Sequence, residues 1–329
     1  MPGEQRFITR AYQPGDEAAI LDLFARCFHA PRSIEHFRWK YLQNPCGNGH
    51  ISLTFDSDRR LVGHYAGYPV PCVESGRDLI AHQIGDTMTD PSIRHVGRGP
   101  TSILGQTALH FYENFCAGRV AFNYGFNVAN IQRFSLRFLR SDRVEPVSYW
   151  RRDSPTKRIA RPSRWLRGYQ LELVRELGAD YDRFFEGVAP AYRFLVRRDA
   201  QYLRWRYLQC PEPGAFMIAI RKWRRLVGWS VFRVRDSRLV WGDALFDPQH
   251  EDALDVLIRH VAPSYPVERL EAWFPARPSW LAGVLTRAGL VSDREPQDLS
   301  VMCVPFVLPD ATERMRQSLY YTMGDSDLF

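Results

Sequence analysis

Residues 85–106 read GDTMTDPSIRHVGRGPTSILGQ, and the interpretation of the whole chain starts from this stretch. The half-apolar run that ends in it, residues 79–89, predicts a strand, and the run 101–115 predicts a helix. Arg94-His95-Val96-Gly97-Arg98-Gly99 stands between them. A helix N-terminus presents unpaired N–H groups and a partial positive charge, glycines permit close backbone approach, and arginines bind anions. The stretch therefore predicts a pyrophosphate site.

The spacing of the two glycines separates this site from other phosphate loops. The dinucleotide fingerprint G-x-G-x-x-G and the nucleotidase loop G-x-x-x-x-G-K-[ST] are both absent. Arg-x-x-Gly-x-Gly, with Pro91 three residues before Arg94, resembles the acyl-CoA-binding signature of the GNAT acyltransferase superfamily. An ordinary strand-to-helix turn with a surface arginine is the alternative. The resemblance implies that acyl-CoA is bound by the following residues: Thr87, Met88, Thr89, Arg94, His95, Val96, Gly97, Arg98, Gly99, Thr101 and Asn130.

Length and composition describe a globular protein with room for two domains. The chain has 329 residues, of which 45% are hydrophobic and 25% charged. It shows no apolar run of about 18 residues and no apolar leader, so we expect no membrane segment and a cytoplasmic location. Six cysteines are scattered without C-x-x-C spacing, which predicts free thiols and no metal site. The net charge of +7 favours anionic partners, although no recognition helix or aromatic platform predicts nucleic-acid binding.

The first 150 residues predict the element order β-α-α-β-β-β-loop-α-β-α, which matches the GNAT layout. The second half then repeats the first. Three segments return in the same order: 37–45 as 203–211, 59–64 as 224–229, and 85–91 as 242–248. An internal repeat of this kind indicates that the chain consists of two related domains. We therefore expect an α/β fold with mixed sheets, made of two tandem GNAT-like domains, as in mycothiol synthase and related tandem acyltransferases.

The two copies differ where the phosphate loop stands. After Asp247-Pro248 the second copy continues without the glycine signature, and Glu251 and Asp252 would repel a pyrophosphate. We expect residues 1–150 to form the CoA-binding domain, 151–168 a basic linker interrupted by prolines, and 169–329 a degenerate GNAT-like domain. A docking patch for an acidic partner is the second interpretation of the linker.

Candidate catalytic groups lie on the strand before the loop. In the family the base, often a Glu or a water it holds, lies there, and His82 and Asp86 share one face of a regular strand. Asp86 is also present in the second copy as Asp243, which favours a bracing role. His64 is either another pocket residue or a satisfied buried histidine.

The general acid is harder to assign from the sequence. The family's Asn is matched by Asn130, but Arg137 and Phe138 stand where the family's acidic tyrosine is expected. Water, or Tyr320 or Tyr321 near the C-terminus, could protonate the thiolate. The tail from Tyr320 to Asp327 either folds over the cleft with its acids or frays.

The resemblance implies an N-acyltransferase that moves an acyl group from acetyl-CoA or another acyl-CoA to an amine of a small-molecule acceptor. Direct attack by the amine needs a base and an acid. Two alternatives stay open: an acidic acyl carrier protein as the donor, and a non-catalytic CoA-binding or scaffold module. We expect a monomer or homodimer, without nucleic acid, membrane or metal.

Overall fold

The structure is a computed structural model that describes residues 7–153, 165–166 and 168–329. The chain divides into two compact units, and neither is continuous in sequence. Unit 1 comprises residues 1–71, 79–146 and 299–314, and unit 2 comprises residues 72–78, 147–298 and 315–329. The sequence alone predicts one division near residue 150. It does not predict that residues 72–78 belong to unit 2, or that residues 299–314 belong to unit 1.

Unit 1 is built on one mixed sheet with the strand order β1-β2-β3-β4-β5-β16-β6. Its strands are β1 (Ile8–Ala11), β2 (His50–Phe55), β3 (Leu61–Glu74), β4 (Arg77–Thr89), β5 (Phe122–Asn127), β6 (Asp142–Pro146) and β16 (Ser300–Pro305). Its helices are α1 (Glu17–Phe28), α2 (Ile34–Tyr41), α3 (Ile103–Phe111) and α4 (Ala129–Phe138), and α9 (Ala311–Ser318) begins in this unit. The β4–β5 pair is parallel, whereas β16 runs antiparallel to both β5 and β6.

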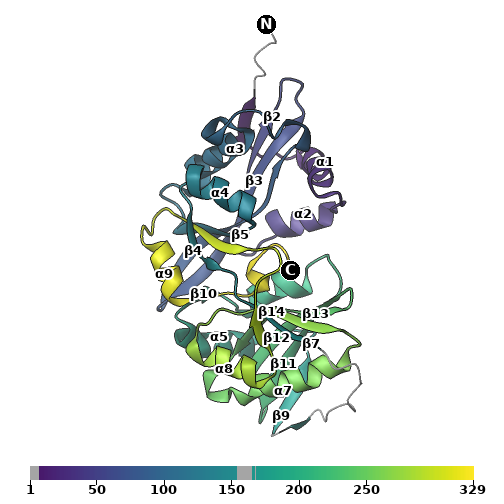
Figure 1. Cartoon of the computed structure of the whole chain (residues 1–329). Helices are drawn as coiled ribbons and strands as arrows, with labels where there is room; N and C mark the ends of the chain where they lie inside the picture. The colour runs from purple at the N-terminus through teal and green to yellow at the C-terminus, as the bar shows by residue number, and fades with distance from the viewer. Residues whose placement is uncertain (1–6, 154–164, 167) are drawn as a thin grey trace. The chain divides into compact units, whose positions relative to one another are not determined.

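Helices cover both faces of this sheet, which explains its apolar strands. Figure 1 shows α3 and α4 against one face and α1 and α2 against the other. Nearly every residue of β3 is buried, as expected for a strand covered on both sides. On the α3 side the core joins Tyr65 of β3 to Phe111 and Tyr112, and Leu139 and Val304 pack with them. Packing on both faces of the sheet therefore fixes the positions of its strands β4 and β5.

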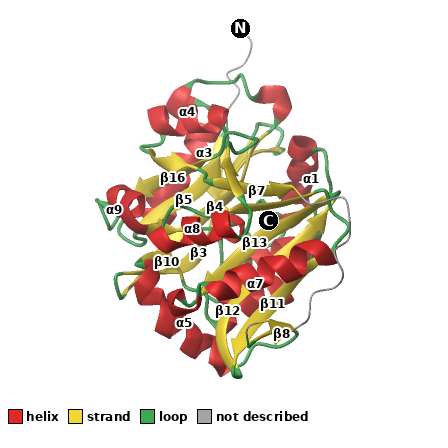
Figure 2. Ribbon diagram, turned by 60° about the horizontal axis from the view of Figure 1, so that its bottom comes forward, coloured by secondary structure: helices red, strands yellow, loops and turns green. Residues whose placement is uncertain are grey.

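Unit 2 has a second mixed sheet, ordered β15-β7-β14-β13-β12-β11-β9-β8. Its strands are β7 (Tyr149–Asp153), β8 (Trp165–Leu166), β9 (Tyr169–Leu173), β11 (Ala215–Lys222), β12 (Arg225–Arg235), β13 (Arg238–Phe246), β14 (Arg269–Trp273) and β15 (Val291–Asp293). Its helices are α5 (Ala179–Tyr192), α6 (Ala200–Leu203), α7 (Asp252–Val261) and α8 (Ser279–Arg287). Figure 2 shows α7 and α8 side by side on this sheet. Two short strands, β10 (Phe194–Val196) and β17 (Leu319–Tyr320), pair with each other, and β10 also pairs with residues 72–74 of β3.

The two sheets share one strand order. Unit 1 reads β1-β2-β3-β4-β5-β16-β6, and unit 2, taken from β9, reads β9-β11-β12-β13-β14-β7-β15. In each sheet the strand next to the parallel pair comes from a distant part of the chain: β16 in unit 1 and β7 in unit 2. The mixed α/β fold with two tandem sheets confirms the fold class expected from the sequence.

The predicted basic linker needs a correction at its start. Residues 151–153 belong to β7, where Arg151 pairs with Asp153 and Asp293. Residues 154–164 and 167 lie outside the described part of the chain.

Candidate active site

A cleft opens in unit 1 where β4 and β5 part. Their parallel ladder consists of two residue pairs, His82 with Asn123 and Gln83 with Tyr124. Both strands continue beyond this ladder, β4 to Thr89 and β5 to Asn127. Asp86 adopts a left-handed conformation with φ 49°, which interrupts the regular strand at this point. The separation leaves backbone groups of both strands facing a common space.

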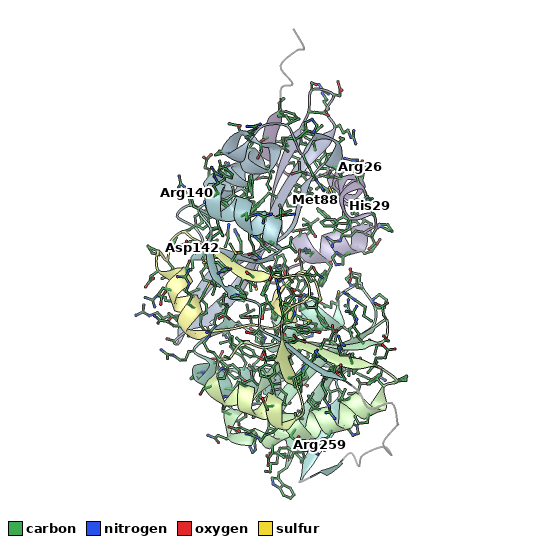
Figure 3. All side chains as sticks on the ribbon, in the orientation of Figure 1. Arg26, His29, Met88, Arg140, Asp142 and Arg259 are labelled. Atoms are coloured by element: carbon green, nitrogen blue, oxygen red, sulfur yellow. The ribbon has the colours of Figure 1, made fainter. Side chains whose placement is uncertain are left out.

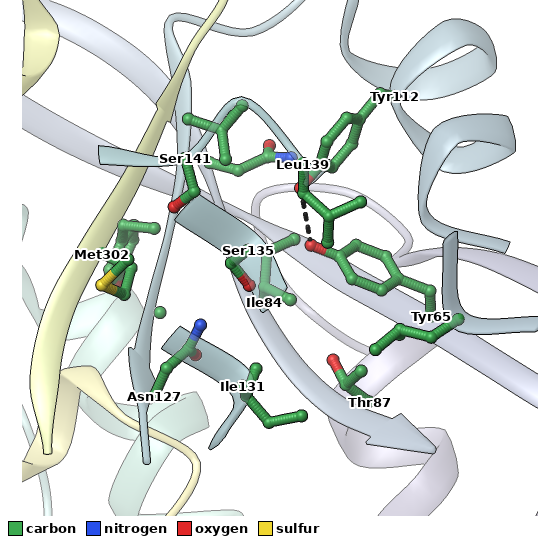
Figure 4. Close-up of a pocket in the computed structure, with 15 residues that line it drawn as sticks. Tyr65, Ile84, Thr87, Tyr112, Asn127, Ile131, Ser135, Leu139, Ser141 and Met302 are labelled. Atoms are coloured by element: carbon green, nitrogen blue, oxygen red, sulfur yellow. Dashed lines mark hydrogen bonds between the residues drawn. The ribbon is translucent and has the colours of Figure 1, made fainter. Parts of the chain in front are cut away.

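Side chains from β3, β4, β5, α3, α4 and β16, and from the segments that follow α3 and α4, line this cleft (Figure 4). The lining residues are Tyr65, Ile84, Thr87, Leu104, Tyr112, Asn123, Tyr124, Gly125, Asn127, Ile131, Ser135, Leu139, Ser141, Met302 and Val304. The hydroxyls of Tyr65 and Tyr112 are hydrogen-bonded at 3.0 Å, the contact drawn dashed in Figure 4. Burial raises the pKa of both phenols, so both stay protonated and can donate hydrogen bonds.

Of the three β4 residues assigned to acyl-CoA, the cleft lining includes Thr87. The next residue, Met88, which is labelled in Figure 3, is buried. Its neighbours in sequence therefore face a different environment, as expected for alternating residues of a strand.

The glycine loop follows β4 and leads into α3 through two short 3₁₀ turns, residues 91–93 and 99–101. Gly97 and Gly99 have φ values of 71° and 54°, a region that favours glycine. A Cβ at Gly97 would lie 2.4 Å from the Thr101 carbonyl oxygen, and one at Gly99 would lie 2.8 Å from the Phe138 ring. Arg94 and Arg98 are exposed. The loop is therefore tightly built, with its arginines on the outside.

Asp86 is buried within a set of ion pairs. Its Oδ2 atom accepts hydrogen bonds from Arg32 at 2.5 Å, Lys40 at 2.9 Å and Tyr41 at 2.7 Å. Burial alone would raise the pKa of Asp86, but the charges of Lys40 and Arg32 and the hydrogen bonds outweigh it and hold the pKa well below its ordinary value. Three donors engage the Oδ2 atom of this carboxylate, which argues against the predicted role of Asp86 as a base.

Unit 2 repeats the Asp86 arrangement around Asp243. Arg198 lies 3.1 Å from an Asp243 oxygen, and the Tyr207 hydroxyl donates to Asp243 at 2.6 Å. Tyr41 and Tyr207 occupy matching positions in the repeated sequence segments. The same Asp–Tyr–Arg set in two copies, only one of which carries the glycine loop, favours a framework role for Asp86.

His82 faces the α3 side of the sheet and has partners for both ring nitrogens. Its Nε2 lies 3.1 Å from His50 Nδ1, and its Nδ1 lies 3.6 Å from Cys116 Sγ. Burial and the neighbouring His50 lower its pKa to about 3. Asp86 contacts α2 instead, so the expectation that His82 and Asp86 share one face is wrong. The left-handed residue at Asp86 explains this, because it breaks the alternation of the strand.

His64 has one satisfied and one unsatisfied ring nitrogen. Its Nδ1 lies 2.7 Å from the carbonyl oxygen of Asp86, the residue before Thr87. Because a carbonyl can only accept, Nδ1 carries the proton and Nε2 carries a lone pair. Nε2 is buried and finds no hydrogen-bond partner within the described residues. Burial lowers the pKa of His64 to about 4, so the ring is neutral near pH 7.

On the β5 side the structure brings other residues to the cleft than the sequence suggested. Asn130 is exposed and bonds to Arg133, whereas Asn127 lines the cleft. Ile131 and Ser135, four residues apart on α4, present one helix face to the cleft. That i, i+4 spacing is the signal that could have identified Ser135.

The C-terminal segment belongs to unit 2, where it is folded rather than frayed. Tyr320 is buried, and its hydroxyl donates to the Ala244 carbonyl oxygen at 2.7 Å. The Tyr321 hydroxyl accepts from the Ser148 N–H. Asp325 pairs with the buried Arg198 at 2.6 Å. These contacts give the segment a packing role in its own unit.

The parallel pair of unit 2 lies beside aromatic side chains. Ala244 of β13 corresponds to Thr87 of β4 in the repeated segments, and its carbonyl oxygen is taken by Tyr320. The Phe274 ring lies 4.7 Å from Trp241 and 6.4 Å from Tyr320. The backbone carbonyl of Ala244 is thus engaged by the chain itself in unit 2.

The described residues contain no group of three or more His, Cys, Asp or Glu side chains arranged to hold a metal ion. Across the same residues, no helix combines the length and apolar character needed to span a membrane.

Comparison with known proteins finds a family model that matches part of the chain. Residues 9–135 match the family model of the acetyltransferase (GNAT) domain. No curated protein matches the chain in sequence. Among solved structures, a probable N-acyltransferase from Enterococcus faecalis V583 is similar at a TM-score of 0.65 and 12% identity, over 92% of this chain and 73% of that one.

Two further structures have the same fold. A GCN5-related N-acetyltransferase from Anabaena variabilis has a TM-score of 0.65 at 14% identity, over 91% of this chain and 72% of its own. Saccharomyces cerevisiae N-myristoyltransferase with bound myristoyl-CoA has a TM-score of 0.58 at 10% identity, over 93% and 80% of the two chains. Residues 9–135 of this chain therefore match the GNAT acetyltransferase domain, and their sheet opens between β4 and β5 beside a glycine loop.

Proposed function

We propose that the protein transfers an acyl group, with acetyl as the first candidate, from acyl-CoA to an amine of a small-molecule acceptor. The observation that carries this proposal is the cleft between β4 and β5, with the glycine loop following β4 directly. Separated strands offer backbone N–H and C=O groups that can pair with the amide groups of a pantetheine arm. Apolar side chains such as Ile84 and Leu104 complete the lining.

The glycine loop is the proposed pyrophosphate site. Residues 94–99 would surround the phosphates with backbone N–H groups, and Arg94 and Arg98 would add charge-assisted hydrogen bonds. Thr87 would lie along the pantetheine arm, and Asn127, rather than Asn130, would face it from β5.

The acceptor amine would attack the thioester carbonyl directly. A bond forms between the amine nitrogen and the acyl carbon, the carbon–sulfur bond breaks, and CoA leaves as the thiol after protonation by water. We assign His64 Nε2 as the acceptor of the amine proton, because its lone pair has no partner in the described residues and its ring is bonded to the strand just before Thr87. Asp86 would hold α2 and β4 together.

The carrier-protein donor receives less support. In the described part of the basic segment, Asp153 and Asp293 neutralise Arg151, and Arg152 donates to the Ala288 carbonyl oxygen. These contacts leave fewer free charges there for an acidic partner than the sequence suggests.

The test is release of free CoA thiol from acetyl-CoA with a panel of amines, followed by product identification by mass spectrometry. We expect release above the hydrolysis rate with at least one amine, and loss of that release in Arg94→Glu. Hydrolysis alone with every amine and every acyl-CoA tested would refute the proposal. Salt-sensitive binding and turnover with an acylated carrier protein, but none with acyl-CoA, would favour the alternative donor.

His64→Asn tests the proposed base. The asparagine amide can still donate to the Asp86 carbonyl, whereas the Nε2 lone pair is lost. We expect kcat to fall by roughly 10²-fold or more with acyl-CoA affinity unchanged, within the usual range for a general base. His82→Asn is the matched control, and we expect its effect on kcat, measured at a temperature where it is folded, to be within about tenfold.

A further inference from the structure

The β11–β12 hairpin of unit 2 differs in charge from its counterpart in unit 1. Residues 221–225 read RKWRR, and the matching residues 56–60 read DSDRR. In unit 1 the turn is self-contained, because the Asp56 carboxylate accepts the N–H groups of Asp58 and Arg60 at 3.0 and 2.9 Å. The second copy has replaced this acidic, internally bonded turn with cations and an exposed tryptophan.

The backbone of the basic hairpin is strained. Trp223 and Arg224, the two residues between the paired Lys222 and Arg225, have φ values of 51° and 70°. Two-residue hairpin loops with this conformation favour Asn and Gly, and a tryptophan or arginine there is strained. Trp223 is 81% exposed, so burial of its ring does not offset that strain. Side chains kept at a strained and exposed position point to a role outside folding.

Beside this hairpin lies a pocket of about 420 Å³, within the size range of small-molecule sites. Four arginines line it, Arg183 from α5 and Arg221, Arg224 and Arg225 from the hairpin, together with two aspartates, Asp180 and Asp247. Four positive and two negative charges leave a net +2 around the pocket.

Ion pairing distributes this charge unevenly. Arg221 is held by Glu172 at 3.0 Å and Asp180 at 2.8 Å, so it forms a fixed wall. Arg225 reaches Asp247 at 3.4 Å while 72% of its side chain is exposed. Arg183 and Arg224 are exposed and make no ion pair with any described residue. Guanidinium groups that converge on one pocket without a carboxylate for each suit an oxyanion with more than one charge.

We propose that this pocket binds a phosphate group, as a monoester or pyrophosphate, through Arg183, Arg224 and Arg225. Trp223 precedes Arg224 in the hairpin loop, and its exposed ring can stack on a base or enter a lipid headgroup layer. The phosphate can thus be carried by a soluble metabolite or by an anionic lipid, and the chemistry of recognition is the same. This site is separate from the glycine loop and does not depend on the proposed acyl transfer.

The test is a calorimetric titration with inorganic pyrophosphate at low salt, in the full chain carrying Arg94→Glu so that the glycine loop does not contribute. Arg183→Gln and Arg224→Gly each remove one cation, and the glycine also relieves the strained turn, so both variants are expected to fold. Arg235→Gln is the charge-matched control, since it lies at the far end of β12, about 33 Å along the strand from Arg225.

We expect each pocket substitution to weaken pyrophosphate binding about tenfold or more, and Arg235→Gln to change it by less than about twofold. Co-sedimentation with phosphatidylcholine vesicles containing phosphatidic acid, lost in Arg224→Gly, would identify a lipid as the source. Pyrophosphate binding without vesicle binding would identify a soluble ligand. No pyrophosphate binding, or binding indifferent to both pocket substitutions, would overturn the proposal.

Discussion

Replacing Asp86 by asparagine distinguishes a framework carboxylate from a catalytic one. The substitution keeps the size of the side chain and an oxygen for the Tyr41 hydroxyl, but it removes the negative charge that Arg32 and Lys40 contact. The side chains of Lys40 and Asp86 are 4% and 6% exposed. Removing one member of a buried ion pair costs about 3–5 kcal/mol. Because Arg32 is 15% exposed and partly hydrated, we expect a loss of unfolding free energy at the lower end of this range, about 3 kcal/mol.

Thermal unfolding measures this loss. At about 2–4 °C per kcal/mol for a unit of this size, we expect the melting temperature to fall by roughly 6–12 °C. The folded pKa of Asp86 lies below its unfolded value, so its stabilising contribution is present above about pH 4 and is lost as the pH falls towards the folded pKa. The gap between wild type and variant should therefore narrow below pH 4.

Asp78→Asn is the control, because the Asp78 side chain beside Arg197 is 76% exposed and we expect a loss of at most about 1 kcal/mol. A melting temperature of Asp86→Asn within about 2 °C of wild type, combined with a loss of turnover of 10²-fold or more, would refute the framework role and return Asp86 to catalysis.

Three further perturbations test other parts of the account. Gly99→Ala places a Cβ 2.8 Å from the Phe138 ring at φ 54°, so acyl-CoA affinity measured by calorimetry should fall about tenfold or more; unchanged affinity would contradict the loop assignment. Burial lowers the pKa of His64 to about 4, so the protein loses stability as the pH falls from about 6.5 to 4, where the unfolded chain binds a proton that the folded chain does not. In His64→Asn, the slope of the urea-unfolding free energy against pH in this window should be smaller by on the order of one proton. Tyr320→Phe removes the hydrogen bond to Ala244 and should lower stability by about 1 kcal/mol while acyl-CoA binding stays the same; weaker binding would contradict the confinement of the CoA site to unit 1.

The features that the sequence predicts well are local ones. The glycines at 97 and 99 are required both by positive φ and by close packing, and such demands show directly in a short motif. The internal repeat likewise marks two similar sheets, because the same residues pack in the same places. Tyr41 and Tyr207, bonded to Asp86 and Asp243, are one example.

The features that the sequence does not predict depend on distant partners or on backbone conformation. The partners of Asp86 come from α2 and from Arg32, more than 40 residues away in sequence, and they reverse its expected role. A left-handed residue at position 86 cannot be anticipated from an aspartate inside an apolar run, yet it undoes the strand parity used to pair it with His82. The exchange of β16 and β7 between the two halves follows from pairing over more than 100 residues.

We propose that one cleft, in unit 1, binds one acyl-CoA per chain. Calorimetric titration of the full chain with acetyl-CoA measures this directly, with a second titration on Arg94→Glu. We expect one equivalent per chain, competed by CoA and lost in the variant. Two equivalents per chain, or binding that survives Arg94→Glu unchanged, would contradict it.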